Sequence, residues 1–392
     1  MPSKKSYDIV LMGATGFTGQ LTAEYLARQK TTGLRWALAG RNPEKLQHVK
    51  AGLLEIDPAL TELDLLQADS NDPASLRDLA GKTRLVISSV GPYLRYGEAL
   101  VRACAEQGTD YIDLTGEPEF VDQTWLSCHA TALASGARIV HCCGFDSIPH
   151  DLGVWFTVQQ LPEDTALRVE GFVSAGGQLS GGTWHSAVNA FSRLRSATMV
   201  ARQRRSKNPF PADRSIGGMR PRIGYRRQIN GWTLPFPSID PQVVRRSAAA
   251  NTRYGPSFAY AHYIRIKSFK NLLTLISGAG LVALGSQIAP TRRLLLKLRQ
   301  PGQGPDAKAR EQAWFRVQFI GQGGSKSVIT EVTGGDPGYD ETAKMLAESA
   351  LCMSKDRLPK KAGCITPAEA MGNRLIKRLQ KAGIGFRVVS SS

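Results

Sequence analysis

The sequence has few cysteines, no low-complexity run and no recognisable leader. None of its six cysteines lies in a CxxC pair or in the spacing of a disulfide framework. Reduced thiols are therefore expected, and no tetrahedral zinc site is predicted. The opening MPSKKSYDIVLMGATG passes from a short basic tail directly into a strand pattern, so a cytoplasmic protein without a secretory signal is expected. With 392 residues, 42% of them hydrophobic, the chain is too long for one core and predicts at least two globular domains.

Acidic residues are scarce in the second half of the chain. The net charge is +17, yet residues 1–150 hold 14 Lys and Arg against 18 Asp and Glu. The positive excess is densest in 191–228, where Asp213 is the only acid. Such a stretch favours a polyanionic partner, either anionic lipid or an acidic carrier protein, with a solvated surface loop as the alternative. It lacks zinc-finger spacing, an RNP-type aromatic motif and a helix-turn-helix, so no nucleic-acid partner is predicted.

A glycine-rich turn follows the first predicted strand. The segment YDIVLMGATGFTGQLTAEYLARQ, residues 7–29, is an apolar strand, a turn and an amphipathic helix, and its glycines are spaced G-x-x-G-x-x-G. That spacing allows a tight turn, a backbone close to a pyrophosphate and close helix–strand packing. The helix N-terminus offers N–H groups and a positive dipole end to the phosphates. The pattern predicts dinucleotide binding through Gly13, Thr15, Gly16, Phe17, Thr18 and Gly19.

The end of the second predicted strand indicates which dinucleotide binds. Residues 34–40, LRWALAG, lead into Arg41, where an NAD site usually has an acidic residue for the ribose hydroxyls. An arginine suits a 2′-phosphate through bidentate, charge-assisted contacts, so NADP(H) is the predicted cofactor. A surface arginine beside a turn is the alternative. Asp69, closing the third strand, is expected to meet the adenine, and Gly91 and Pro92 leave the fourth strand at the expected crevice.

Strand and helix patterns alternate through the first 150 residues. Further strands are indicated at 62–69, 83–92, 109–117 and 137–143, separated by helical patterns such as 72–81 and 96–108. This alternation predicts an α/β fold with a Rossmann-type, doubly wound parallel sheet of six strands. After residue 153 the alternation fades, and strands at 166–176 and 313–335 predict a mixed sheet. The expected domains are a NADP-binding domain (1–150), an α+β substrate- and membrane-facing domain (151–340) and a C-terminal helical segment (341–392).

The motifs GATGFTG, GPY, YGEALVRACAEQGTDYIDLTGE and GFDSIPHDLG resemble those of the saccharopine dehydrogenase-like oxidoreductases. The chain is most similar to their trans-acting enoyl reductase branch and to lipid-droplet-associated animal relatives. The resemblance resumes at 334–352 and 363–386 and is weakest from 190 to 310. It implies an NADPH-binding domain, a second α+β domain over the nicotinamide, and a C-terminal helix packed back on the first domain. It also implies hydride delivery to an acyl thioester substrate.

The stretch CCGFDSIPHDLG, residues 142–153, is the expected hinge between the domains. Phe145 and Asp146 are predicted to face the cofactor, and Asp146 or Ser147 to cap a helix that Pro149 begins. Reduction of an enoyl thioester needs hydrogen-bond donors for the enolate oxygen that develops, and a general acid that gives a proton to the α-carbon. The candidate catalytic residues are Tyr93, Ser147 and His150, although packing of the tyrosine ring is an equal alternative. A non-catalytic cofactor-binding protein at a lipid surface and a saccharopine-type amino-acid dehydrogenase are the alternative functions.

A second candidate for function is the uncharged segment between Lys270 and Arg292. Its length is close to a membrane span, but three glycines and a proline make it only marginally hydrophobic. Basic residues flank it on both sides, so we expect 271–299 to contact a membrane surface peripherally, with a buried helix or a homodimer face as alternatives. Thr183 and Ser186 are expected to cap a helix at the glycine turn 181–182, and His185 beside them is a weak functional candidate.

Overall fold

The computed structural model describes residues 5–176, 188, 193–298 and 305–392 and divides the chain into two compact units. Unit 1 is Met1–Phe145 with Tyr339–Arg378, and unit 2 is Asp146–Gly338 with Leu379–Ser392. Each unit thus consists of two separate pieces of chain. The segment with Thr183, His185 and Ser186 lies outside the described residues.

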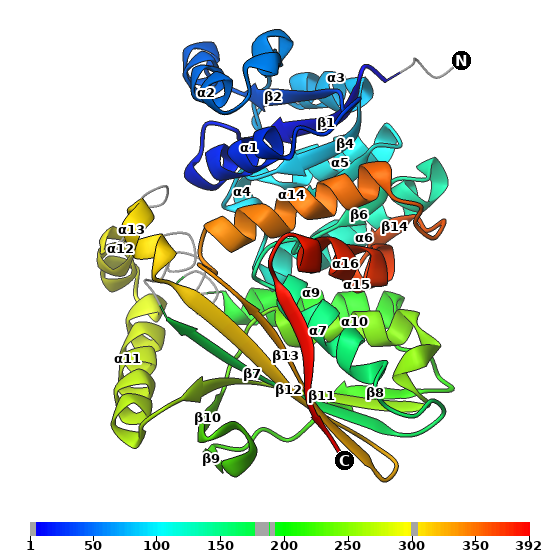
Figure 1. Ribbon diagram of the computed structural model, residues 1–392, viewed down its shortest axis with the longest axis vertical. Helices are drawn as coiled ribbons and strands as arrows, with labels where there is room; N and C mark the ends of the chain where they lie inside the picture. The colour runs from blue at the N-terminus through cyan, green and yellow to red at the C-terminus, as the bar shows by residue number, and fades with distance from the viewer. Residues whose placement is uncertain (1–4, 177–187, 189–192, 299–304) are drawn as a thin grey trace. The chain divides into compact units, whose positions relative to one another are not determined.

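Unit 1 is built on a parallel sheet of seven strands in the order β14-β6-β5-β4-β1-β2-β3 (Figure 1). Its strands are β1 (Tyr7–Met12), β2 (Trp36–Gly40), β3 (Asp64–Gln67), β4 (Thr83–Ser88), β5 (Asp110–Asp113), β6 (Arg138–Val140) and β14 (Gly363–Ile365). Its helices are α1 (Phe17–Gln29), α2 (Pro43–Ile56), α3 (Pro73–Lys82), α4 (Tyr93–Tyr96), α5 (Glu98–Glu106), α6 (Pro118–Ser135), α14 (Asp340–Lys355), α15 (Pro367–Ala370) and most of α16 (Gly372–Lys381).

Short sequence signals start several of these helices. The side chains of Asn42 and Asp72 accept hydrogen bonds from backbone N–H groups in the first turns of α2 and α3, and a proline follows each cap. Thr366 caps α15 in the same way by accepting from the N–H of Glu369. These caps satisfy N–H groups that have no partner inside the helix, so the helix starts are encoded locally.

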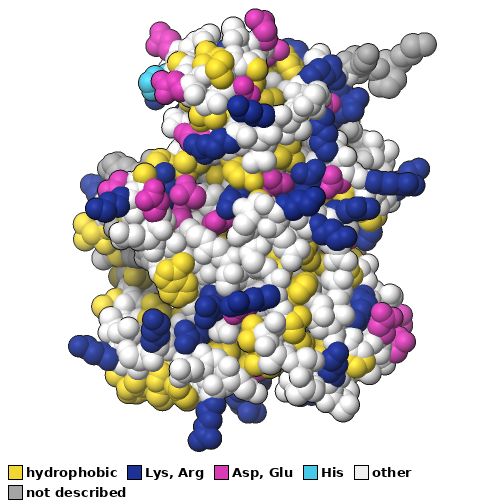
Figure 2. All heavy atoms as spheres, viewed as in Figure 1, with side chains coloured by type: hydrophobic (Ala, Val, Ile, Leu, Met, Phe, Trp, Pro, Cys, Tyr) yellow, Lys and Arg dark blue, Asp and Glu magenta, His cyan; other side chains and the backbone are white. Residues whose placement is uncertain are grey.

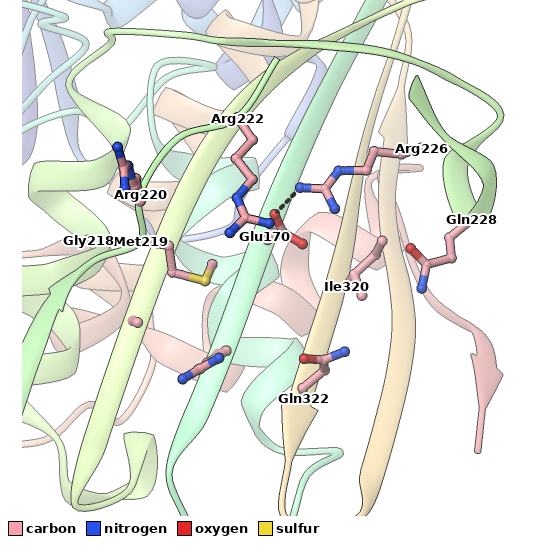
Figure 3. Close-up of a pocket in the computed structure, with 11 residues that line it drawn as sticks. Glu170, Gly218, Met219, Arg220, Arg222, Arg226, Gln228, Ile320 and Gln322 are labelled. Atoms are coloured by element: carbon pink, nitrogen blue, oxygen red, sulfur yellow. Dashed lines mark hydrogen bonds and ion pairs between the residues drawn. The ribbon is translucent and has the colours of Figure 1, made fainter. Parts of the chain in front are cut away.

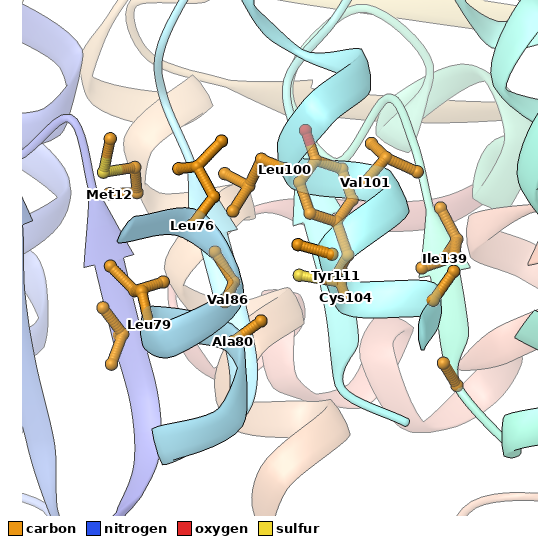
Figure 4. Close-up of a cluster of buried hydrophobic side chains, with 14 of the residues drawn as sticks. Met12, Leu76, Leu79, Ala80, Val86, Leu100, Val101, Cys104, Tyr111 and Ile139 are labelled. Carbon is orange, nitrogen blue, oxygen red and sulfur yellow. The ribbon is translucent and has the colours of Figure 1, made fainter. Parts of the chain in front are cut away.

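One face of the unit 1 sheet packs against α3 and α5 in a continuous core (Figure 4). Side chains from the strands interlock there with apolar side chains of the two helices, and the largest are fully buried. The core members labelled in the figure are Met12, Leu76, Leu79, Ala80, Val86, Leu100, Val101, Cys104, Tyr111 and Ile139. Burial raises the pKa of the Cys104 thiol well above its usual range, which makes this cysteine a packing residue.

The predicted doubly wound fold is confirmed, with one strand more than expected. The six strands indicated by the sequence form as a parallel set, and β14 adds a seventh beside β6. Three residues carry too little pattern to indicate a strand from sequence. The return of C-terminal helices to the first unit is also confirmed, since α14 packs on α1 and the Tyr25 hydroxyl donates to Glu348 at 2.9 Å. The sixth strand ends at Val140, so Cys142 and Cys143 follow it instead of ending it.

Unit 2 contains a mixed sheet in the order β15-β13-β12-β7-β11-β10-β9, with β8 paired to β11. Its strands are β7 (Leu167–Gly176), β8 (Ser215–Gly218), β9 (Gly224–Arg226), β10 (Gly231–Pro235), β11 (Ser257–Ile266), β12 (Trp314–Gly323), β13 (Lys326–Gly334) and β15 (Gly385–Ser391). Its helices are α7 (Ile148–Val158), α9 (Leu194–Lys207), α10 (Asp240–Ala250), α11 (Phe269–Gln287), α12 (Ala289–Lys297) and α13 (Ala307–Glu311).

Helix α7 packs on one face of this sheet, against β12 and β13. A Cβ on Gly153 would lie 2.3 Å from the ring of Phe319, so only glycine lets the helix approach β12 this closely. The predicted α+β architecture is therefore confirmed, and the strands expected at 166–176 and 313–335 are β7 and the β12–β13 hairpin.

Candidate functional site

The turn after β1 needs two of its three glycines for the backbone itself. Gly13 has φ +92°, and a Cβ there would lie 2.7 Å from Ser89 Oγ. A Cβ on Gly19 would lie 2.2 Å from the carbonyl oxygen of Gly13. These two positions fix the tight turn and the close packing of α1 on β1.

The third glycine has a different environment. Gly16 is exposed, has an ordinary φ of −80° and occupies the N-cap position of α1 without a side-chain cap. A Cβ there would come no closer than 3.4 Å to the Gly13 carbonyl oxygen. The first turn of α1 therefore begins at an uncovered backbone, which fits a pyrophosphate bound by N–H groups. Thr15 and Thr18 on either side are partly exposed, and the Phe17 ring packs edge-on against Tyr339.

The strand order brings the other predicted cofactor residues of unit 1 to the same edge. β1 lies between β2 and β4, and successive strands depart from it in opposite directions, which defines the switch point of the sheet. The Ser89 hydroxyl donates to the Gly13 carbonyl at 3.1 Å, so the segment leading to Gly91 and Pro92 adjoins the glycine turn. All of these residues follow the carboxyl ends of their strands.

Arg41 and Asp69 follow the next two strands of this edge. Arg41 is exposed directly after β2, at the position where an acidic residue would favour NAD. β3 ends at Gln67, two residues before Asp69, and the Asp69 carboxylate accepts from the backbone and side chain of Asn71 at 2.9 and 3.1 Å. The Asp69 carboxylate therefore stabilises the loop after β3, and its contact with adenine stays a prediction.

Replacing Arg41 by alanine should weaken NADPH binding about 10- to 100-fold and leave NADH binding nearly unchanged. A charge-assisted contact with the 2′-phosphate would be lost, and NADH has no such phosphate. Fluorescence titration of both cofactors measures the difference. Lys45→Ala is the matched control, since it removes an exposed positive charge four residues away. An equal loss for the two cofactors would contradict the assignment.

Tyr93 begins α4 and lies inside unit 1. Its ring is 4% exposed, and its hydroxyl donates to the Ser88 carbonyl at 3.0 Å and accepts from the Leu114 N–H at 3.4 Å. Burial, with the nearby Asp113 charge, raises the pKa of this phenol well above its usual value. The hydroxyl is thus engaged in the core, which favours the packing alternative over proton donation.

Ser147 and His150 meet at one buried carboxylate in unit 2. The Ser147 hydroxyl donates to Asp240 Oδ1 at 3.1 Å, and His150 Nδ1 lies 3.1 Å from the same oxygen. Ser147 has φ +114° and occupies the N-cap position of α7 without capping it by its side chain. The predicted serine cap is therefore wrong, because the hydroxyl bonds to Asp240 at the start of α10.

Three more side chains, those of Ser238, Tyr260 and His262, complete this cluster, which we call the Asp240 cluster. His262 Nε2 lies 3.5 Å from Asp240 Oδ2, and the Tyr260 hydroxyl lies 3.0 Å from His262 Nδ1. Ser238 donates to Asp240 Oδ2. Ser147, His150, Asp240, Tyr260 and His262 are each at most 5% exposed. The two histidines and the aspartate also lie close enough together to hold a cation, and the carboxylate accepts from the two serine hydroxyls as well.

The charges of this cluster follow from burial and from its internal contacts. Burial alone would raise the pKa of Asp240, but the charge of His150 and its hydrogen bond, with His262 and Ser238, hold it well below its usual range. Burial lowers the pKa of His262 to about 3, against the opposing effect of Asp240. Asp240 is therefore ionised and His262 neutral at physiological pH.

Asp146, next to the cluster in sequence, has the opposite shift. Burial, and then the negative charge of Asp240, raises the pKa of Asp146 to about 6, although His150 opposes the shift. A carboxyl group that titrates near neutral pH is suited to general acid–base work. Its neighbour Phe145, the last residue of this piece of unit 1, donates its N–H to Thr342 Oγ1 at 3.1 Å.

Asp146→Asn should stabilise the protein at pH 8 and change little at pH 4. Between about pH 4 and pH 6 the folded state holds a proton that the unfolded state releases, so stability falls as pH rises to about 6 and stays low above it. The substitution removes that cost, about 3 kcal/mol for a shift from 3.8 to about 6, and should raise the melting temperature by about 5–10 °C. Thermal unfolding across this pH range tests it, with the exposed Asp213→Asn as control. The same gain at both pH values would argue against the shift.

Sequence reasoning missed Asp240, Tyr260 and His262. Asp240 precedes a proline at the start of α10, a pattern of ordinary helix starts, and the other two alternate along a strand. Nothing in their local sequence indicates that they meet residues 147 and 150. Only the packing of α7, α10 and β11 within unit 2 brings them together.

Helix α11 is a separate candidate surface in unit 2. With 19 residues, the helix is long and apolar enough to cross a membrane by length and composition. Only 11% of its apolar 18-residue stretch is buried inside the structure. Leu281 and Leu284 are each 72% exposed, and Leu272 is the buried leucine. Figure 2 shows hydrophobic side chains at the lower left, over this helix, with basic side chains beside them. The exposure excludes the alternative that 271–290 is a helix buried in the unit.

The parallel sheet, the glycine turn at its switch point and the uncovered start of α1 together define a dinucleotide-dependent oxidoreductase. Residues 9–140 match the family model described as the saccharopine dehydrogenase NADP binding domain, which confirms NADP(H) as the cofactor. The chain belongs to the saccharopine dehydrogenase-like oxidoreductase family, as its relatives show.

Three of these relatives match over nearly their full length. A protein of Mycobacterium tuberculosis named as a trans-acting enoyl reductase is 35% identical, covering 98% of this chain and 97% of its own. The trans-acting enoyl reductase of Mycobacterium ulcerans is 34% identical over 97% of both chains. The human saccharopine dehydrogenase-like oxidoreductase is 34% identical over 99% of both.

Among solved structures, the saccharopine dehydrogenase (L-Glu forming) of Saccharomyces cerevisiae shares the fold. Its TM-score is 0.59 with 10% identity, and the match covers 98% of this chain and all of that one. At this identity the likeness concerns the fold alone.

Proposed function

We propose that this oxidoreductase reduces the C=C bond of an enoyl thioester with NADPH, in lipid or polyketide-lipid biosynthesis. The observation that carries the proposal is the full-length similarity to two mycobacterial proteins named as trans-acting enoyl reductases. The exposed Gly16 backbone and Arg41 support it, since they suit the pyrophosphate and the 2′-phosphate of the cofactor.

The reaction requires little covalent chemistry from the protein. The bound cofactor supplies a hydride for the β-carbon of the substrate. The protein must then donate hydrogen bonds to the enolate oxygen and deliver a proton to the α-carbon. We assign the proton to Asp146, whose pKa of about 6 leaves a useful protonated fraction near neutral pH. His150, whose Nδ1 lies 3.1 Å from Asp240 Oδ1, is the positioning residue beside it.

NADPH consumption with defined substrates tests this function. The wild-type protein should oxidise NADPH with an enoyl thioester on CoA or on a carrier protein, with one saturated acyl product formed per NADPH. The corresponding saturated thioester is the control and should give no consumption. NADPH binding without turnover of any enoyl thioester would favour the non-catalytic lipid-surface protein. Reduction of NADP⁺ with saccharopine would favour the amino-acid dehydrogenase.

We also propose that the protein is cytoplasmic and contacts a lipid surface peripherally through α11 and α12. The exposed leucines of α11 would enter the acyl boundary, while Lys267, Lys270, Arg292 and Arg293 flank them for anionic headgroups. The composition of the 19-residue helix meets that of a membrane span only narrowly, because three glycines, two serines and a glutamine interrupt its apolar residues, so we favour peripheral contact.

The double substitution Leu281→Asp with Leu284→Asp should abolish co-sedimentation with anionic phospholipid vesicles. Both side chains are 72% exposed, so the fold should tolerate the change while the apolar contact is lost. Leu133→Asp, at a 52% exposed leucine of unit 1, is the matched control. Unchanged sedimentation would contradict the proposal, and a dimer that dissociates in the double variant would identify α11 as a homodimer face instead.

A further inference from the structure

A cavity of about 590 Å³ lies in unit 2 on the sheet face opposite α7 (Figure 3). Glu170 of β7 lies directly opposite Ile320 of β12, and both line the cavity. The next pair along, Gly171 and Phe319, is on the other face, where Phe319 meets Gly153 of α7. The volume is in the range of small-molecule sites, and every lining residue belongs to unit 2.

The lining is strongly basic. Four arginines, Arg168, Arg220, Arg222 and Arg226, surround a single acidic residue, Glu170. Arg226 forms an ion pair with Glu170 at 3.1 Å. In Figure 3 the side chains of Arg222 and Arg226, four residues apart in the sequence, both extend toward Glu170. One acid cannot neutralise four guanidinium groups, so the cavity keeps a positive excess that a multiply charged anion would balance.

Three of these arginines come from the basic stretch 191–228 that the sequence singles out. Arg220 and Arg222 lie in the connection 219–223 between the short strands β8 and β9, Arg226 ends β9, and β7 supplies the fourth arginine. The positive charge of this stretch is therefore not all on a solvated loop, because three of its arginines line the cavity. The planar guanidinium fork matches phosphate oxygens in a bidentate manner.

We propose that this cavity binds the phosphate groups of the handle that carries the acyl thioester. Free CoA and the phosphopantetheine arm of a carrier protein share that chemistry, a phosphate ester joined to a flexible thiol-bearing chain. Arg168, Arg220 and Arg222 contact phosphate, and Glu170 orients Arg226 toward it. This assignment rests on the proposed function, since it presumes a thioester substrate.

Direct binding tests the cavity without any turnover. Isothermal titration measures CoA and inorganic pyrophosphate against the full chain, with NADPH saturating the glycine turn. Arg220→Ala with Arg222→Ala should weaken both ligands at least about tenfold, because each loses charge-assisted contacts. Both arginines are exposed, so folding should be unaffected. Arg227→Ala, exposed and outside the cavity lining, is the control and should bind as the wild type does. Unchanged binding by the double variant would overturn the proposal.

Kinetics separate this inference from the proposed function. With enoyl-CoA or an enoyl carrier protein, the double variant should show a raised KM, and whichever substrate is affected identifies the natural handle. With the N-acetylcysteamine thioester, which lacks phosphate, KM should not change. An equal rise for the truncated thioester would overturn the phosphate assignment. If the wild type reduces no thioester, the proposed function fails, while loss of pyrophosphate binding in the double variant would still support an anion site.

Discussion

Replacing Gly16 by valine should weaken NADPH binding about 100-fold, or more, and leave thermal stability without cofactor nearly unchanged. The backbone at Gly16 is exposed and has an ordinary φ, so a larger side chain fits the folded protein. The same side chain would stand where a pyrophosphate has to approach the start of α1. Titration with NADPH, together with thermal unfolding of the cofactor-free protein, measures both effects.

Gly19→Ala is the comparison variant, because it should disturb the fold as well as cofactor binding. Its Cβ would lie 2.2 Å from the Gly13 carbonyl oxygen, so α1 must move away from β1. We expect a loss of about 3 kcal/mol or more in stability, accompanied by weaker binding. Wild-type NADPH affinity in the Gly16 variant would show that the cofactor does not use this turn.

Asp240→Ala should lower the free energy of unfolding by about 3–5 kcal/mol, the largest stability loss expected among these variants. Removing the carboxylate leaves His150, His262 and the Ser147 hydroxyl buried without their shared partner. Chemical denaturation measures the loss. Asp240→Asn keeps the shape and one acceptor oxygen, so its effect should be smaller.

The matched control is Glu163→Ala in the same unit. Glu163 pairs with Arg253 at 3.3 Å, but its side chain is 72% exposed, so the pair should contribute at most about 1 kcal/mol. If Asp240→Ala cost no more than Glu163→Ala, the Asp240 cluster would not hold α7, α10 and β11 together. A large loss of stability accompanied by normal turnover of the remaining folded protein would restrict the cluster to a structural role.

The nucleotide-binding residues of unit 1 could be predicted from sequence because their chemistry is local. Gly13, Gly16 and Gly19 are within seven residues of one another; Gly13 and Gly19 are required by the backbone, and Gly16 leaves the start of α1 uncovered, so all three appear in the local pattern. Arg41 is predictable for the same reason, since it follows directly after a recognisable strand. Fold class follows from the same alternation of strand and helix.

The Asp240 cluster of unit 2 depends on contacts that local sequence does not encode. His150 contacts Asp240, which is 90 residues later in the chain. Asp240 also contacts His262 on β11, which is further still from His150 in sequence. The hydroxyl groups of Tyr93 and Ser147 bond to partners that the sequence does not indicate, for a related reason. A motif places a residue along the chain, but the direction of its hydroxyl depends on tertiary neighbours such as Ser88 and Asp240.

The two-piece construction of unit 1 determines when this cofactor domain can form during synthesis. The glycine turn emerges first, yet α14 and β14, which pack on α1 and extend the sheet beside β6, lie beyond residue 339. A nascent chain of 145 residues would have to keep the apolar faces awaiting those elements exposed while some 190 more residues are made. The NADPH domain is therefore among the last parts of the protein to be finished, although its defining motif is among the first to be translated.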